Sequence, residues 1–487
     1  MELKVKLLKW SAGSPVAMLN SKTAEKIGVH SMDRISLKCA KGEMATIIDT
    51  IGTVVKENEI AVSTEIRDAL SLKKSQKLEV NLAPSPESLI SIKSKLNSNT
   101  LSEKQIYLII QDIVDNNLSE AEIALFVSAM YKQGMDFKET VSLINAILKT
   151  GNKLDLNSKY VVDKHSIGGI PGNRTTPIIV AVCAAAGLIM PKSSSRAITT
   201  SAGTADVMET IAKIEFSIKD LKKIVKKTNG CLIWGGGLGM VPADSKIIKI
   251  EKKLGIDPEA QLLASIMSKK LALGANYIII DIPYGKTAKV NKKKALDLKK
   301  KFEKLGKHFK KKLKVLLTKA DQPMGIGVGP TLELKDVIAV LDPKKQGPKD
   351  LEEKSLFLAS ELLKMTKKGD LKTAQEILHS GKAYEKFKQI IKSQGGKIPN
   401  ALPQAKYTKA IKSKKAGTIK EIDNKKINNL GRAAGAPVDK LAGLEIHHEV
   451  GCNIKRKEPL VTIHAESRSR LRQAIKFYKK ERPILVK

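Results

Sequence analysis

Residues 163–173 read DKHSIGGIPGN and lie between a β-branched segment at 160–162 and a long apolar segment that begins at Thr175. A strand, a glycine-rich loop and a buried helix in this order are typical of a parallel α/β sheet. The glycines let the backbone approach an anion closely, and the free N–H groups at the start of the helix point towards it. Lys164 adds a positive charge and Ser166 a hydroxyl donor. We therefore expect a ligand site at this strand end rather than an ordinary glycine-rich turn.

The alternation of strands and helices continues after this loop. The segment LIMPKS at 188–193 leads out of the first helix, and buried strands are expected at 231–236 (CLIWGG) and 277–282 (YIIIDI). This rhythm argues for a largely parallel sheet. Helices are expected at 175–186, 206–213, 217–228, 258–273, 333–342 and 351–365.

The sequence patterns on either side of this region are different. Residues 1–84 hold short, β-branched, partly alternating segments and end in the proline-containing LAPSPES. Residues 86–150 show capping-box patterns at Ser102, Ser119 and Asp136, each before an apolar run, which predicts helices. The C-terminal region has strand-like segments separated by Gly and Pro. The predicted fold class is a multidomain α/β protein with a β-rich N-terminal domain (1–84), a helical subdomain (85–155), a large α/β domain with a mostly parallel sheet (156–393) and a C-terminal α+β domain (394–487).

The charge of the chain is strongly positive. Its 487 residues include 87 Lys plus Arg against 50 Asp plus Glu, a formal net charge of +37. Such a charge suits nucleic acid, an anionic membrane or phosphorylated substrates. Nucleic-acid surfaces favour arginine and aromatic side chains, but only ten of the basic residues are Arg and aromatic residues make up 4%. We therefore favour the interpretation that most lysines are solvated and spread over the protein surface. The alternative is that the chain is a basic nucleic-acid-binding protein rather than an enzyme.

The lysine-rich region 291–314 could be a nucleic-acid arm or a helix. Apolar residues lie in it at helical spacing: Phe302, Leu305, Phe309 and Leu313. This pattern favours an amphipathic helix with a solvated lysine face.

Other sequence features exclude several classes of protein. The longest apolar run, Pro177 to Pro191, is too short to span a bilayer, and the charged N-terminus lacks the apolar region of a signal peptide. We therefore expect a cytoplasmic protein without a membrane partner. Four cysteines without CxxC spacing indicate neither a disulfide framework nor a zinc site. His447 and His448 are adjacent in a strand-like segment and would face opposite ways, so no metal site is expected.

A second polar loop follows the buried segment. Residues 193–206 read SSSRAITTSAGTAD, and seven of these fourteen residues carry hydroxyl groups around the single Arg196. Such a segment cannot form a core, but it can form a shell of donors for phosphate and ribose oxygens. Since it runs from a buried segment into a helix, we interpret it as a binding loop rather than an ordinary surface loop.

These two loops together resemble the thymidine/pyrimidine-nucleoside phosphorylase family. The family signature is Ser-(Gly/Ser)-Arg-(Gly/Ala)-aliphatic, followed by Gly-Thr-x-Asp-x-aliphatic-Glu. It is matched at Ser194 to Ala197 and at Gly203 to Glu209. The resemblance covers about residues 86–487. Later blocks that fit are Pro242-Ala243-Asp244, the run ASIMSKKLALGANYIIIDIPYGKTAK, Gln322-Pro323, and the region from Gly431-Arg432 to His464.

The sequence departs from the pyrimidine-type members at three places. They continue Lys-His-Ser as Thr-Gly-Gly-Val-Gly-Asp, whereas Ile167 and the segment IPGNR at 170–174 stand here. The segment IEKKLGIDPEAQ at 250–261 lacks the Arg that holds the pyrimidine, and the chain has an additional N-terminal domain. These departures are those of the archaeal AMP phosphorylase branch. Its members split nucleoside 5′-monophosphates with phosphate, giving ribose 1,5-bisphosphate and the free base. We favour this branch over a pyrimidine-nucleoside phosphorylase.

The resemblance implies roles for individual residues. Asp257 is the expected proton donor. Lys164, Ser166 and Ser194 match positions that hold inorganic phosphate in the pyrimidine enzymes. Phosphate is a co-substrate, so no metal or organic cofactor is implied, and the expected partners are a small-molecule nucleotide, phosphate and further copies of the chain in a homo-oligomer. The residues expected to bind AMP are Gly169, Ser195, Arg196, Ala197, Ile198, Thr199, Thr200, Thr204, Ser265 and Lys289.

Four questions stay open at this level. An aspartate that donates a proton near neutral pH needs burial or a neighbouring carboxylate, and we hypothesise that base stacking and desolvation act on Asp257. A plain helix N-cap is the structural alternative for this residue. Lys286 competes with Lys289 for the nucleotide 5′-phosphate. The function of His165 and the preference among AMP, CMP and UMP are undecided.

Overall fold

The computed structural model describes residues 1–8, 10–13, 15–156, 158–197 and 200–487. They form two compact units, of which the first comprises Met1–Gly151 with Pro242–Ser265 and the second Asn152–Val241 with Ile266–Lys487. The boundaries predicted above assign residues 242–265 to the α/β domain, whereas this segment packs with the first unit. In the part of the chain that is described, no helix is long and apolar enough to cross a membrane.

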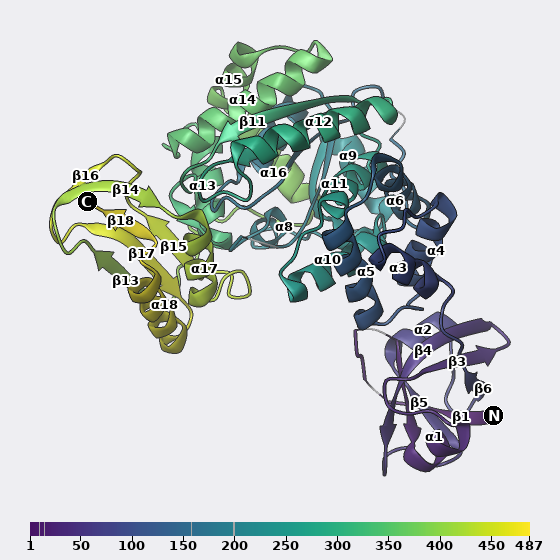
Figure 1. Ribbon diagram of the computed structural model, residues 1–487. Coiled ribbons are helices and arrows are strands. Elements are labelled where there is room, and N and C mark those ends of the chain that lie inside the picture. Colours follow the sequence, from purple (N-terminus) through teal and green to yellow (C-terminus); the bar gives the residue numbers. More distant parts are fainter. Residues whose placement is uncertain (9, 14, 157, 198–199) are drawn as a thin grey trace. The chain divides into compact units, whose positions relative to one another are not determined.

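The first unit begins with a closed β-barrel (Figure 1). Its strand order is β1-β5-β2-β4-β3-β6. Alternate side chains point inward, so that Leu3 and Val5 on one strand and Ile35 and Leu37 on another are buried. The elements are β1 (Glu2–Leu7), β2 (Val16–Asn20), α1 (Ser21–Ile27), β3 (Arg34–Cys39), β4 (Gly42–Ile51), β5 (Glu59–Val62), α2 (Thr64–Leu70) and β6 (Lys77–Leu82).

The rest of the first unit is helical. The three predicted capping boxes at Ser102, Ser119 and Asp136 are confirmed at the starts of three successive helices. Lys246 Nζ donates to the carbonyl oxygens of Ile113 and Val114, at 2.8 Å each, and so satisfies acceptors at the end of one helix. This contact attaches the segment around Lys246 to the helical subdomain. The helices are α3 (Ser88–Leu96), α4 (Glu103–Val114), α5 (Glu120–Gln133), α6 (Phe137–Lys149) and α10 (Pro242–Leu254).

The second unit is built on a parallel sheet. Strand β10 (Tyr277–Tyr284) lies between β7 (Val162–Ser166) and β11 (Lys312–Lys319) and pairs in parallel with both. Strands β8 (Met190–Ser194) and β9 (Gly230–Trp234) are also parallel, and a parallel bridge between Val161 and Ile189 joins them to β7. The carboxyl ends of these strands therefore meet at one edge, as the strand and helix rhythm predicts.

Helices surround this sheet, and α7 is buried along almost its whole length. The helix predicted over 291–314 ends at His308, and the prediction is wrong for Leu313, which lies in β11. The reason is spatial: the chain folds back after α12, and Leu313 packs against Gly306 from the strand. Helix α11 (Glu259–Ala272) begins in the first unit and ends in the second. The other helices are α7 (Thr175–Ala185), α8 (Thr204–Met208), α9 (Ile218–Thr228), α12 (Lys292–His308), α13 (Pro330–Leu341), α14 (Lys349–Thr366), α15 (Leu371–His379) and α16 (Lys382–Ser393).

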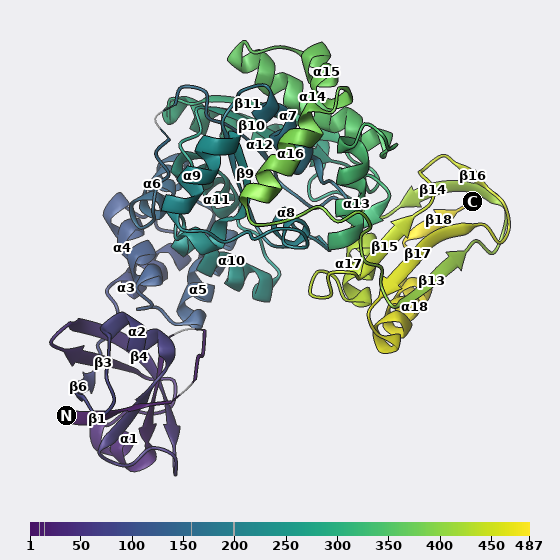
Figure 2. The same ribbon diagram turned by 180° about the vertical axis from the view of Figure 1, so that it is seen from behind.

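The C-terminal part of the second unit combines antiparallel strands with two helices, α17 and α18, which lie side by side (Figure 2). One sheet has the order β12-β15-β17-β13 and the other the order β16-β14-β18. Strand β15 ends at Ile446, so His447 and His448 follow the strand rather than lie in it. The elements are β12 (Gly327–Val328), β13 (Tyr407–Lys412), β14 (Gly417–Ile422), α17 (Asn424–Ala434), β15 (Gly443–Ile446), β16 (Asn453–Ile454), β17 (Pro459–Ala465), α18 (Arg468–Glu481) and β18 (Ile484–Val486).

Candidate active site

Two of the residues expected to hold phosphate lie at the carboxyl edge of the parallel sheet. Ser166 ends β7 and Ser194 ends the neighbouring parallel strand β8. The Ser194 Oγ atom is buried and, among the described residues, has no hydrogen-bond partner. Buried hydroxyl groups are normally paired, so this donor is available to an oxygen of a ligand.

The glycine-rich loop after β7 is held in a conformation that only glycine permits. Gly172 has a φ of +70°, and a Cβ atom there would lie 1.9 Å from the carbonyl oxygen of Met324. The Met324 N–H in turn donates to the Pro171 carbonyl at 3.0 Å. The next residue, Asn173, has a buried Oδ1 atom without a hydrogen-bond partner in the described chain. The contacts with Met324 thus hold the glycine-rich loop directly before α7. In anion sites at the start of a helix, the first N–H groups of the helix point towards the anion.

Lys164 lies in a buried cluster of charges on the central strands. Its Nζ donates to Thr175 Oγ1 at 2.9 Å and lies 3.9 Å from Asp281 Oδ2, which is 3.1 Å from Lys354 Nζ. Burial lowers the pKa of Lys164 to about 7, although Asp281 acts in the opposite direction. Burial opposes ionisation of Asp281, but Lys354 and Lys164 outweigh it and lower the pKa of that carboxyl. The amine of Lys164 is therefore held by an ionised carboxylate, and its side chain is only 1% exposed.

A second buried ion pair adjoins the first on β7. Asp163 pairs with Lys270 and, at 3.4 Å, with Lys192. The Lys192 Nζ also donates to the Ser193 carbonyl at 2.8 Å. Desolvation lowers the pKa of His165 well below its usual value, and Lys270 and Lys192 act in the same direction. His165 is thus a neutral imidazole near neutral pH.

The hydroxyl-rich loop after β8 is folded around the buried carboxylate of Asp206. Its Oδ2 accepts from the Ala197 N–H at 2.7 Å and from the Gly203 N–H at 2.8 Å. The Thr200 hydroxyl donates to the Ala202 carbonyl at 2.7 Å. These bonds hold the described parts of the loop, at Ala197, Thr200 and Gly203. Two of the residues expected to bind AMP, Ile198 and Thr199, lie outside the described residues.

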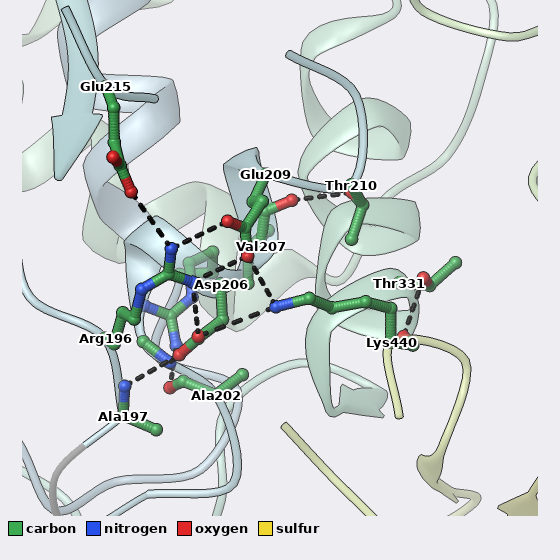
Figure 3. A network of polar contacts seen from close by, with 12 residues as sticks. Arg196, Ala197, Ala202, Asp206, Val207, Glu209, Thr210, Glu215, Thr331 and Lys440 are labelled. Atoms are coloured by element: carbon green, nitrogen blue, oxygen red, sulfur yellow. Dashed lines mark hydrogen bonds and ion pairs between the residues drawn. The ribbon is translucent and has the colours of Figure 1, made fainter. Parts of the chain in front are cut away.

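Arg196 is occupied by acidic partners (Figure 3). Its guanidinium donates to both carboxylate oxygens of Glu209, at 2.6 and 2.7 Å, and lies 3.6 Å from Glu215. It also stacks over the Trp234 ring, 4.9 Å from the centroid. The bonds to Glu209 raise the pKa of Arg196, and together with Lys440 they lower the pKa of Glu209 to about 2. The arrangement indicates that the Arg196 side chain orders the loop.

Arg174 is a residue whose role the sequence reasoning missed. This buried side chain donates to Glu333 Oε2 at 2.7 Å, to Thr204 Oγ1 at 2.7 Å and to the Ala202 carbonyl at 2.8 Å. It therefore connects the end of the glycine-rich loop, the hydroxyl-rich loop and α13. The only signal in the sequence is an arginine directly before a helix that is apolar from Pro177 onward, and its partner Glu333 is remote in the chain.

The expected proton donor and one expected nucleotide ligand belong to the first compact unit. Asp257 is exposed and precedes Pro258, whose carbonyl accepts from the Leu262 N–H at 2.9 Å near the start of α11. Ser265 is buried on α11, and Lys269 follows it one helical turn later. The other candidate residues that the structure describes belong to the second unit.

The two lysines proposed for a 5′-phosphate have different surroundings. Lys286 is 78% exposed, and its Nζ lies 2.6 Å from Glu421 Oε2. Lys289 lies beside the glycine-rich loop, because a Cβ atom added to Gly169 would be 3.0 Å from the Lys289 Cβ. The surroundings thus favour Lys289.

Three family models match the chain. The helical bundle domain of a glycosyl transferase family matches residues 91–151, and the a/b domain of that family matches residues 158–384. The C-terminal domain of pyrimidine nucleoside phosphorylases matches residues 418–485. The matched ranges follow the order of the helical, α/β and C-terminal regions predicted from the sequence.

Known proteins resemble the chain over nearly all of its length. The AMP phosphorylases of Pyrococcus horikoshii and Pyrococcus abyssi are 44% and 46% identical to it, covering 100% of this chain and 98% of each relative. A putative thymidine phosphorylase of Legionella pneumophila is 40% identical, covering 91% of this chain and 87% of the relative. The solved anthranilate phosphoribosyltransferase of Thermus thermophilus has a TM-score of 0.52 at 16% identity, covering 63% of this chain and 99% of that one, a likeness of fold.

Proposed function

The chain belongs to the AMP phosphorylase family, and on that premise we propose that it cleaves AMP with inorganic phosphate to adenine and ribose 1,5-bisphosphate, with CMP and UMP as further candidate substrates. The observation that carries the proposal is the carboxyl edge of the sheet. Two polar loops follow neighbouring strands there, and the buried Ser194 hydroxyl has no hydrogen-bond partner among the residues that the structure describes. Such an edge suits a ligand with several phosphate oxygens.

The proposed reaction is a substitution at the anomeric carbon of the ribose. A phosphate oxygen forms the new bond to C1′, while the bond from C1′ to the adenine nitrogen breaks and its electron pair leaves with the base. Asp257 donates a proton to the departing adenine, since an adenine anion is a poor leaving group. Ser166, Ser194 and the charge of Lys164 hold the phosphate. The protein thus acts through positioning and electrostatics.

Lys289 is the proposed partner of the nucleotide 5′-phosphate. It adjoins Gly169 in the glycine-rich loop, whereas Lys286 is paired with Glu421 at the surface. A cation at this position would favour a nucleotide over a nucleoside. The proposal also includes a cytoplasmic location, assembly into a homo-oligomer and a reaction without metal or organic cofactor.

The decisive test is phosphate-dependent release of adenine. We expect adenine from AMP and phosphate, and release from adenosine slower by at least about a hundredfold, because adenosine lacks the group that Lys289 binds. Chromatography of the free base measures both rates. Release of thymine from thymidine, without release of any base from AMP, CMP or UMP, would instead establish a pyrimidine-nucleoside phosphorylase. Filter binding with a steep salt dependence would favour the nucleic-acid alternative.

The pKa of Lys164 gives a second prediction, for anion binding. Sulfate keeps its charge across this range and competes with phosphate, so its inhibition constant reports on protein groups alone. Lys164, with a pKa of about 7, is charged below that pH and loses its charge above it. We therefore expect sulfate to bind more weakly as the pH rises from about 7 to about 9, by up to about tenfold per pH unit.

The Asp281→Asn variant is the control for this pH dependence. It removes the carboxylate that favours the charged form of Lys164, so the loss of sulfate binding should begin at lower pH. An inhibition constant that is the same at all pH values would exclude Lys164 from the anion site.

A further inference from the structure

Helix α17 carries a polar stripe on one face. Asn424, Asn428 and Arg432 follow one another at intervals of four residues, which places them on the same side of the helix. Asn424 is wholly buried and Asn428 is 2% exposed. Buried amides need hydrogen-bond partners, and these partners lie outside the C-terminal domain.

Asn428 bridges the two polar loops of the candidate site. Its Oδ1 accepts from the Ser201 N–H at 3.0 Å, and its Nδ2 donates to the Gly169 carbonyl at 3.1 Å. The Ser201 hydroxyl also donates to the Asn428 main-chain carbonyl at 2.9 Å. One side chain therefore uses its donor for the glycine-rich loop and its acceptor for the hydroxyl-rich loop.

Asn424 holds the third loop, which carries Lys289. Its Nδ2 donates to Thr287 Oγ1 at 3.0 Å and to the Ala320 carbonyl at 3.1 Å, and its main-chain N–H donates to Thr287 Oγ1 at 3.2 Å. Thr287 is two residues from Lys289. The same helix face therefore contacts all three loops that contain candidate ligands in the second unit.

The C-terminal part of α17, at Gly431 and Arg432, packs closely against the hydroxyl-rich loop. The Arg432 guanidinium donates to the Thr200 carbonyl at 3.2 Å. A Cβ atom added to Gly431 would lie 2.5 Å from Ser201 Oγ, so a larger residue there would push the helix away from the loop. The helix backbone at Gly431 therefore lies directly against the Ser201 side chain of the loop.

We propose that Asn424 and Asn428 are positioning residues of the active site, and that the C-terminal domain thereby sets the relative placement of its three loops. This inference rests on the proposed function for its kinetic consequence alone. The loops are short, so a shift of about 1 Å in their backbone would misalign the groups that hold nucleotide and phosphate. The Asn428 amide suits this role because it accepts and donates from one rigid plane, whereas Asn424 acts through its Nδ2 and main-chain N–H donors.

The test compares Asn428→Ala and Asn424→Ala with Asn429→Ala, an exposed neighbour on the same helix. Amide hydrogen exchange is measured on the full-length protein without substrate. For Asn428→Ala we expect exchange to rise at least about fivefold in peptides covering 165–173 and 195–206. For Asn424→Ala we expect the rise at 285–290 instead. Asn429→Ala should match the wild type, and all variants should match it in residues 103–149.

The kinetic arm measures the KM for AMP and kcat. Asn428→Ala should raise the KM at least about fivefold while the melting temperature stays close to that of the wild type. Exchange unchanged in all three loops, or a general rise throughout the C-terminal domain, would overturn the inference. If AMP is not cleaved even by the wild type, the proposed function fails, but the exchange pattern still decides whether the two asparagines fix the loops.

Discussion

Replacement of Asp257 by Asn is expected to lower phosphate-dependent adenine release by about 10²- to 10⁴-fold, the range that positioned general acids contribute. Asparagine keeps the size and hydrogen-bonding capacity of the side chain but cannot give up a proton to the base. Asp257 is exposed in the structure. The desolvation that favours a protonated aspartate would therefore have to come from the bound nucleotide. The measurement is kcat with saturating AMP and phosphate, with Asp220→Asn on the exposed start of α9 as the matched control.

A second substrate separates loss of the acid from loss of binding. A nitrophenyl ribofuranoside 5-phosphate has a leaving group that needs no protonation. If Asp257 acts as the acid, the variant should cleave this substrate at a rate within about tenfold of the wild type. Equal loss with both substrates would assign Asp257 to positioning, and full activity of Asp257→Asn with AMP would remove it from the mechanism.

The sequence predicted those structural elements of the candidate site that depend on local chemistry. The strand before Ser166, the glycine-rich loop and α7 follow from hydrophobic pattern and turn residues, which act over a few neighbours. The capping boxes at Ser102 and Ser119 are local in the same sense. The placement of Ser166 and Ser194 at one edge then follows from the parallel pairing of their strands.

The remainder depends on contacts between distant parts of the chain. Arg174 pairs with Glu333, 159 residues away, and Ser201 bonds to Asn428, 227 residues away. Helix α17 was not predicted from the sequence, because its two lysines and three asparagines leave few apolar residues to mark its buried face. The Leu313 prediction failed for a related reason. Leu313 continues the helical spacing of the apolar residues before it, but it lies in the following strand and packs against the helix from there. The spacing of apolar residues shows which face of a helix or strand is buried, but it does not show which other element packs against that face.

The second large effect concerns the buried pair of Arg174 and Glu333. Glu333→Gln should destabilise the protein by about 3–5 kcal/mol, because it leaves the charge of Arg174 buried without a carboxylate. The Arg174 side chain is 8% exposed and that of Glu333 1%, with 2.6 Å between Arg174 Nη2 and Glu333 Oε2. The measurement is urea unfolding monitored within the second unit. Glu421→Gln, which breaks the exposed pair with Lys286, should leave the midpoint unchanged.

The double variant Arg174→Met with Glu333→Leu tests whether the buried ion pair supports the fold or holds the hydroxyl-rich loop. Burial raises the pKa of Glu333 against the attraction of Arg174, which indicates that desolvation consumes much of the gain from pairing. An apolar pair of similar volume should therefore recover most of the stability lost in Glu333→Gln. It should not recover activity, since the bonds from Arg174 to Thr204 and to the Ala202 carbonyl are gone. A stable double variant with an unchanged KM for AMP would show that Arg174 only supports the fold. A stable double variant with a raised KM would show that the buried charge of Arg174 holds the hydroxyl-rich loop.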